Sequence, residues 1–150
     1  MIQRIQSVYL LVVTILLVVC LCTPIGSYIG NDYSVSAFTN LCITMADGNK
    51  DYAPWALFVI LLVAAVLAFG TIFLFKKRML QIRLTIFSTI LLVGYYATLI
   101  TFIFMLKGDQ MTFSLSWPVC LPLVAIILNW LAVRAIGKDE VLVKAYDRLR

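Results

Sequence analysis

The sequence predicts an all-α membrane protein, a four-transmembrane-helix bundle with a small extracytoplasmic antiparallel β-sheet, folded as one domain over residues 1–150. The first observation is composition: 63% of the residues are hydrophobic and only 13% are charged, whereas soluble domains are nearer half apolar and a quarter charged. The second is a set of four long apolar runs, and the third is the clustering of cations at the ends of these runs. Too few charged residues exist to cover a surface in water, so a lipid-facing surface is expected.

Four apolar runs are long enough to cross a bilayer, which takes about 20 mostly apolar residues. The predicted spans cover about residues 5–23, 54–75, 84–106 and 117–136. The second and third spans carry no charge, and the fourth contains Asn129 and Arg134 towards its end. Arg4 lies just before the first span, where its long side chain can reach the headgroup region.

The first apolar run also has features of a signal peptide, because an early arginine is followed by an apolar stretch. The segment after this run, CTPIGS, contains no cleavage motif of the A-x-A type. An uncleaved first helix is therefore the favoured interpretation.

Cations are distributed unevenly between the two ends of the predicted spans. Lys and Arg in short loops remain on the cytoplasmic side of a membrane. One end carries ten cations, while the other has Lys50 and Lys107. The ten are Arg4, Lys76, Lys77, Arg78, Arg83, Arg134, Lys138, Lys144, Arg148 and Arg150. This bias predicts that both termini are cytoplasmic and that the segment containing Lys76 and Lys77 is a tight hairpin that anchors the topology.

The net charge of +5 raises the question of a nucleic-acid partner. The cations lie at the ends of apolar runs and form no groove of their own, so no nucleic-acid partner is expected. The lipid bilayer is the expected environment, and contact with anionic lipids is a by-product of the topology signal.

Two outer loops are predicted, over residues 24–53 and 107–116, and both contain segments of strand composition. The first loop is too long for a simple turn. The candidate strands are Tyr33–Phe38, Leu41–Ala46 and Met111–Ser116. In the last of these, apolar and polar residues alternate, which is typical of a half-buried strand. We expect the three strands to form an antiparallel sheet in which Met111, Phe113 and Leu115 cover the ends of the helices.

The C-terminal segment GKDEVLVKAYDRLR is predicted to leave the fourth span at Gly137 and to start a new helix. Asp139 and Glu140 suit a helix N-terminus because they oppose the positive end of the helix dipole. The apolar residues that share helical spacing are Leu142, Ala145, Tyr146 and Leu149. We therefore expect residues 139–150 to form a short amphipathic helix on the cytoplasmic membrane surface. A solvated tail and a partner-docking helix are the alternatives.

The four cysteines, Cys20, Cys22, Cys42 and Cys120, all lie in the outer half of the predicted bundle. A thiol oxidoreductase typically uses a C-x-x-C pair. The first two cysteines here have C-x-C spacing on a helix, where the side chains point roughly apart. Redox catalysis, one structural disulfide and burial as small apolar residues are the three interpretations, and burial is favoured.

The chain contains no recognised catalytic, cofactor-binding or metal-binding motif. It has no histidine, which is the commonest metal ligand. No P-loop, H-E-x-x-H or G-x-S-x-G sequence occurs. We therefore predict no catalytic, cofactor-binding or metal-ligating residue, and we expect that the protein is not an enzyme.

Polar side chains inside the third and fourth spans remain as candidates for function. Ser88 and Tyr95 lie in the third span with Gly94, a combination that suits close packing against another helix. Asn129 is interpreted as a hydrogen-bonding residue between helices rather than as a substrate ligand. A transport path usually requires ionisable groups inside the membrane, and the central parts of the spans have none. A pore made by so short a chain would also require an oligomer.

The two ends of the chain, MIQRIQSVYLL and KDEVLVKAYDRLR, resemble the opening and closing motifs of a family of small Bacteroidota membrane proteins with no assigned activity. The resemblance extends over the whole chain, with four hydrophobic spans in register. It implies a bacterial inner membrane, with the outer sheet in the periplasm. The closing motif of the family is nearer to VRSxDRLR, whereas Ala145 and Tyr146 precede Asp147 here. The resemblance implies no functional residues.

The lack of catalytic motifs, together with an outer sheet and an amphipathic tail, predicts a non-enzymatic protein that scaffolds or assists a larger inner-membrane complex. An oligomeric transporter or channel subunit is the alternative, and a thiol-redox membrane protein ranks below it. The expected partners are the lipid bilayer and either another membrane protein or further copies of the chain.

Overall fold

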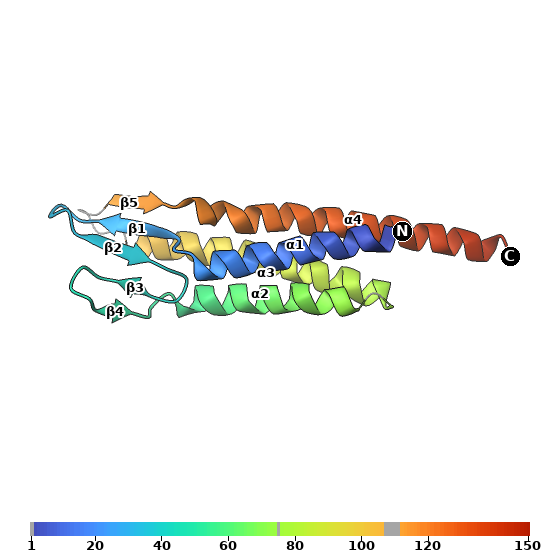
Figure 1. Ribbon diagram of the computed structural model, residues 1–150, viewed down its shortest axis with the longest axis horizontal. Helices are drawn as coiled ribbons and strands as arrows, with labels where there is room; N and C mark the ends of the chain where they lie inside the picture. The colour runs from blue at the N-terminus through green and yellow to red at the C-terminus, as the bar shows by residue number, and fades with distance from the viewer. Residues whose placement is uncertain (1, 75, 107–111) are drawn as a thin grey trace.

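The computed structural model describes residues 2–74, 76–106 and 112–150, which form four long helices and a five-stranded sheet (Figure 1). The helices are α1 (Ile2–Cys22), α2 (Trp55–Phe73), α3 (Arg78–Leu106) and α4 (Leu121–Arg148), with a short 3₁₀ helix, η1 (Trp117–Cys120), before α4. The sheet lies at one end of the helices, called the sheet end below. The start of α1, the α2–α3 turn and the end of α4 lie at the opposite end, called the terminal end (Figure 1).

The four helices form an antiparallel bundle in which neighbours in sequence are neighbours in space. α1 packs against α2 and α4, and α3 packs against the same two helices. The connections between them give an up-down-up-down order. The α2–α3 connection is the tightest of them, because α3 begins at Arg78 soon after α2 ends at Phe73.

Within the described residues, four helices are long and apolar enough to cross a membrane. Their outward faces are apolar as well as their core. For example, Ile15, Val66, Ile90 and Ile127 are each more than half exposed. Helices that carry large aliphatic side chains on their outward faces as well as in their core suit a lipid solvent better than water. The predicted combination of four apolar helices with a small antiparallel sheet is confirmed.

The helices occupy all four predicted spans, but their bounds differ at the terminal end. α3 begins at Arg78 rather than near residue 84, so Arg83 is helical instead of lying in a loop. Arginine, methionine, leucine and glutamine, which make up most of this first turn and a half, are strong helix formers. Long cationic side chains can also keep their heads in water while their stems cover apolar surface. The prediction assigned these charged residues to a loop, and it therefore started the helix too late.

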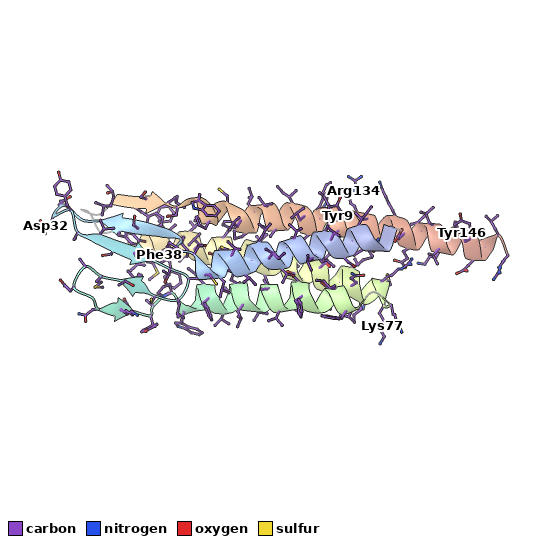
Figure 2. All side chains as sticks on the ribbon, viewed as in Figure 1. Tyr9, Asp32, Phe38, Lys77, Arg134 and Tyr146 are labelled. Atoms are coloured by element: carbon purple, nitrogen blue, oxygen red, sulfur yellow. The ribbon has the colours of Figure 1, made fainter. Side chains whose placement is uncertain are left out.

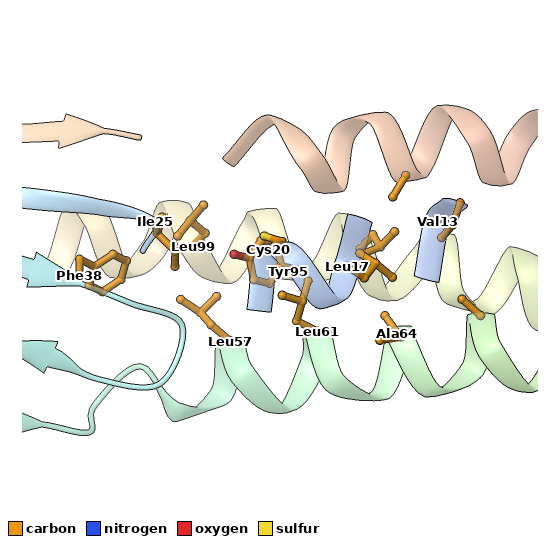
Figure 3. Packing of buried hydrophobic residues seen from close by; sticks show 14 of the residues in the cluster. Val13, Leu17, Cys20, Ile25, Phe38, Leu57, Leu61, Ala64, Tyr95 and Leu99 are labelled. Atoms are coloured by element: carbon orange, nitrogen blue, oxygen red, sulfur yellow. The ribbon is translucent and has the colours of Figure 1, made fainter. Parts of the chain in front are cut away.

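The core of the bundle continues from the helices into the base of the sheet. Ala64 and Ala68 of α2 are buried, and such small side chains let helix backbones approach closely. Ile25 and Phe38, from the sheet end, pack into the same cluster as the helices (Figure 3). The helical members of the cluster include Val13, Leu17, Leu57, Leu61, Tyr95 and Leu99. The sheet and the bundle therefore share one core.

The sheet has the strand order β4-β3-β2-β1-β5, and every neighbouring pair is antiparallel. The strands are β1 (Gly26–Ile29), β2 (Val35–Phe38), β3 (Ile43–Thr44), β4 (Lys50–Asp51) and β5 (Thr112–Leu115). β1 pairs with β2 on one side and with β5 on the other. The sheet thus joins the loop between α1 and α2 to the loop between α3 and α4.

The three predicted strands are present in shortened form as β2, β3 and β5, whereas β1 and β4 were not predicted. β5 joins the sheet as expected, but it pairs with β1, with Phe113 opposite Tyr28. Met111 lies outside the described residues. Phe113 packs against the core cluster, but Leu115 is 60% exposed. The prediction that Leu115 covers the helix ends is therefore wrong. Leu115 lies opposite Gly26, which has no side chain to pack against it.

α4 runs without interruption from Leu121 to Arg148 and projects past the other helices at the terminal end (Figure 1). The predicted helix break at Gly137, with a separate helix over 139–150, is therefore wrong. A glycine inside a helix costs only about 1 kcal/mol relative to alanine. Gly137 also lacks the positive φ angle of a glycine that ends a helix. Two residues later, the side chain of Asp139 is held by Gln6 of α1, which favours continuation of the helix.

Candidate functional sites

At the sheet end, the buried side chain of Asn40 joins the β2–β3 connection to two helices. Asn40 is 1% exposed. Its Nδ2 donates a hydrogen bond to the carbonyl oxygen of Cys20 on α1 (2.8 Å), and its Oδ1 accepts one from the hydroxyl of Tyr95 on α3 (2.7 Å). Both ends of the amide are therefore used. Tyr95, which the sequence indicated as a helix-packing residue, is buried in the core cluster with residues of α1 and α2, and it also bonds to this loop.

The 3₁₀ helix η1 is held by contacts to the same two helices. The thiol of Cys20 donates a weak hydrogen bond to the carbonyl oxygen of Pro118 (3.6 Å). The hydroxyl of Tyr96 donates to the carbonyl oxygen of Val119 (2.6 Å). Cys20 and Tyr95 lie close together in this region (Figure 3). We call Cys20, Asn40, Tyr95 and Tyr96 the sheet-end polar cluster. Its contacts hold the β2–β3 connection and η1 to α1 and α3.

Three aromatic rings fill the space beneath the central strands. Tyr28, Phe38 and Phe113 come from β1, β2 and β5, and their ring centroids lie 4.8 to 6.0 Å apart, as is usual for favourable ring pairs. The Tyr28 hydroxyl has no hydrogen-bond partner within the described residues, and burial raises the pKa of this phenol. A Cβ atom added to Gly26 would lie 2.7 Å from the Phe113 ring, so a glycine is required at that position.

The four cysteines are free thiols in different surroundings. Cys20 is buried, Cys42 is half-buried, and Cys22 and Cys120 are exposed. The structural disulfide that was considered as one interpretation is therefore not formed. The buried thiol of Cys20 and its contact with Pro118 fit the favoured interpretation of this cysteine as a packing residue.

In the middle of the bundle, two buried polar side chains lie on neighbouring helices. Asn129 of α4 and Ser88 of α3 are at most 1% exposed, and neither side chain has a hydrogen-bond partner within the described residues. Two α3–α4 contacts lie on either side of them along the bundle, Arg78 to Asp139 and Tyr96 to Val119. This antiparallel register places Ser88 at the level of Asn129. The prediction that Asn129 hydrogen-bonds between helices is wrong, because the side chains share a level without coming within bonding distance.

At the terminal end, Asp139 links α4 to two other helices. Its side chain accepts a hydrogen bond from Nε2 of Gln6 on α1 (2.8 Å), and its backbone carbonyl accepts a long one from the guanidinium of Arg78 on α3 (3.4 Å). Asp139 is 7% exposed. The sequence indicated this residue as the start of a tail helix, and it singled out Gln6 for no role.

Two open grooves flank α4 at the terminal end. The larger, of about 670 Å³, lies between the α2–α3 turn, the start of α3 and the projecting part of α4. Five of the predicted topology cations line it: Lys76, Lys77, Arg78, Arg83 and Lys144. The smaller, of about 380 Å³, lies between α1 and α4 and includes Tyr9, Arg134 and Lys138. Figure 2 shows Lys77, Tyr9 and Arg134 at this end of the molecule.

A family model described as a domain of unknown function, DUF4293, matches residues 2–149 of the chain. The chain belongs to the DUF4293 family. This match confirms the resemblance that was inferred from the two ends of the sequence. No curated protein matches the chain.

The side chains that the DUF4293 fold brings together are suited to packing and binding. Among the described residues, no group of three or more Cys, Asp or Glu side chains is arranged to hold a metal ion. The sheet-end polar cluster is occupied by internal hydrogen bonds. The grooves at the terminal end and the projecting part of α4 are open to other molecules.

Proposed function

We propose that this DUF4293 protein is a non-enzymatic, multi-pass protein of the bacterial inner membrane that acts as a scaffold or accessory subunit of a larger complex. One observation carries the proposal. Residues 141–150 are all exposed, and Figure 2 shows Tyr146 on the part of α4 that lies beyond the bundle. A single helix standing alone in water is marginally stable, so a partner that covers it would stabilise both.

The projecting helix carries apolar side chains on one face. Leu142, Tyr146 and Leu149 are 49%, 73% and 86% exposed, and their spacing of four and then three residues places them along one side of a helix. Burying one large apolar side chain contributes about 1.5–3 kcal/mol. Three such residues make this face suitable for docking into an apolar groove of another protein.

The proposal places the terminal end in the cytoplasm and the sheet in the periplasm. The support is the positive-inside rule, because the cationic side chains of the α2–α3 turn and of α4 are at one end of the molecule, while Lys50 is at the other. Reporter fusions at Arg150 and at Asn49 should therefore report opposite compartments. A periplasmic signal from the fusion at Arg150 would contradict this orientation.

The partner is tested by purifying the full chain through an N-terminal tag in a mild detergent. We expect a stable complex with a different membrane protein, in a fixed ratio of the two chains. Recovery of the chain alone in every detergent that preserves its fold would count against a scaffold.

A second candidate, an oligomeric transporter or channel subunit, is favoured by one feature. Ser88 and Asn129 form a buried polar level inside the bundle, and neither side chain has a hydrogen-bond partner within the described residues; polar groups inside membrane spans often mark transport paths. Native mass spectrometry distinguishes the two candidates. A ring of identical chains would support the transporter, and a complex of different chains would support the scaffold.

A further inference from the structure

We propose that the larger groove at the terminal end binds the phosphate headgroup of an anionic phospholipid. This groove of about 670 Å³ is bounded by the α2–α3 turn, the first turns of α3 and the projecting part of α4. It is made by segments about 60 residues apart in the chain, because Arg78 of α3 contacts Asp139 of α4. The inference concerns a lipid site and goes beyond the proposed scaffold function.

The charge of the groove suits a phosphate group. Glu140 and Asp147 are the acidic residues on its lining, against five cations. Glu140 pairs with Lys144 at 3.0 Å, so two of these charges offset each other. The other lining cations are Lys76 and Lys77 of the α2–α3 turn and Arg78 and Arg83 of α3. Arginine binds phosphate through paired N–H groups, and lysine binds it as a compact charge.

The apolar part of the groove distinguishes a phospholipid from other anions. Met79, Leu80 and Val143 line the same groove and are 54%, 40% and 44% exposed. A free phosphate would leave these side chains in water. A phospholipid places its phosphate beside the cations and its glycerol and upper acyl carbons beside the apolar residues. The groove also begins where the apolar span of α2 ends, at Phe73, which is the depth of headgroups around a membrane helix.

The test measures lipid binding to the full chain purified in a neutral detergent. Phosphatidylglycerol and phosphatidylcholine with identical acyl chains are titrated separately, and bound lipid is counted by native mass spectrometry. We expect tighter binding of phosphatidylglycerol. Each basic residue near an anionic surface contributes about a fivefold factor in affinity. Lys77→Gln with Arg83→Gln should therefore weaken phosphatidylglycerol binding by about fivefold to thirtyfold and leave phosphatidylcholine binding unchanged.

A matched control removes the same charge outside the groove. Arg148→Gln with Arg150→Gln deletes two cations from the exposed end of the chain, neither of which lines the groove, and it should leave the phosphatidylglycerol affinity within about twofold. Lys77 and Arg83 are chosen because Arg78, which contacts Asp139, stays in place. If the groove double variant fails to fold, Lys77→Gln alone should still show about a fivefold loss.

Several outcomes would overturn the assignment. Equal affinity for the two lipids would remove the role of the headgroup charge. Equal losses in both double variants would indicate diffuse electrostatic attraction rather than a site. Competition by inorganic phosphate at the same concentration as the lipid would show that the acyl part contributes nothing. Preferential competition by poly-glutamate would assign the groove to an acidic peptide.

Discussion

The hydroxyl of Tyr95 offers a sharp test of how the sheet is held to the bundle. Tyr95→Phe removes the hydrogen bond to Oδ1 of Asn40 (2.7 Å) and changes little else in shape. A neutral hydrogen bond contributes about 1 kcal/mol to stability, and an unpartnered buried acceptor costs about 1–3 kcal/mol. Because Asn40 is 1% exposed and Tyr95 fully buried, water cannot replace the lost donor. We expect the free energy of unfolding to fall by about 1–3 kcal/mol.

Tyr28→Phe is the matched control for this prediction. Tyr28 is also buried, but its hydroxyl has no partner within the described residues, so its removal should be neutral or slightly stabilising. Both variants are compared with the parent by thermal unfolding in the same detergent. Tyr95→Phe combined with Asn40→Ala should cost less than the sum of the single changes. Equal stability of the two tyrosine variants, or additive losses in the double variant, would refute the proposed link.

Further predictions concern backbone positions and the face of β5, and each is measured by the same unfolding assay. Gly26→Ala should cost about 1–3 kcal/mol, because its Cβ would lie 2.5 Å from the Ser114 carbonyl oxygen. Gly70→Ala, inside α2, meets nothing within 4 Å and should be neutral to stabilising by up to about 1 kcal/mol. Phe113→Asp should destabilise the protein by at least about 2 kcal/mol more than Ser114→Asp, because Phe113 packs against the core and Ser114 is exposed. Gly137→Ala should stabilise the protein by up to about 1 kcal/mol, and a loss would contradict a continuous α4.

The helices could be predicted because lipid leaves few choices to an apolar chain. A spanning segment must satisfy its backbone hydrogen bonds internally, so an apolar run of about 20 residues is read directly as a helix. The predicted helix ends were less accurate where a single residue was taken to mark the end of a helix. Gly137 was taken as a helix end, and Arg83 as part of a loop, although tertiary packing and long cationic side chains allow both to be helical.

The polar contacts could not be predicted, because their partners are far apart in the chain. Asn40 reaches Tyr95 across 55 positions, and Gln6 reaches Asp139 across 133. No local pattern distinguishes such an asparagine or glutamine from one that faces water. The missed strand β1 has only four residues, and it pairs with the distant β5 as well as with the neighbouring β2. The alternation of apolar and polar residues in β5 could be read from the sequence, but the strand with which β5 pairs could not.

The scaffold proposal depends most directly on the apolar face of the projecting helix, and one quantitative purification tests it. The tagged full chain is compared with a variant that carries Tyr146→Ser and Leu149→Ser. The control carries Asp147→Ser and Arg148→Ser, which are also exposed and leave the net charge unchanged. The account predicts that the first variant loses most of the co-purifying membrane protein while the control retains it, with both variants folded and inserted. Full retention of the partner by the first variant would contradict docking through this face.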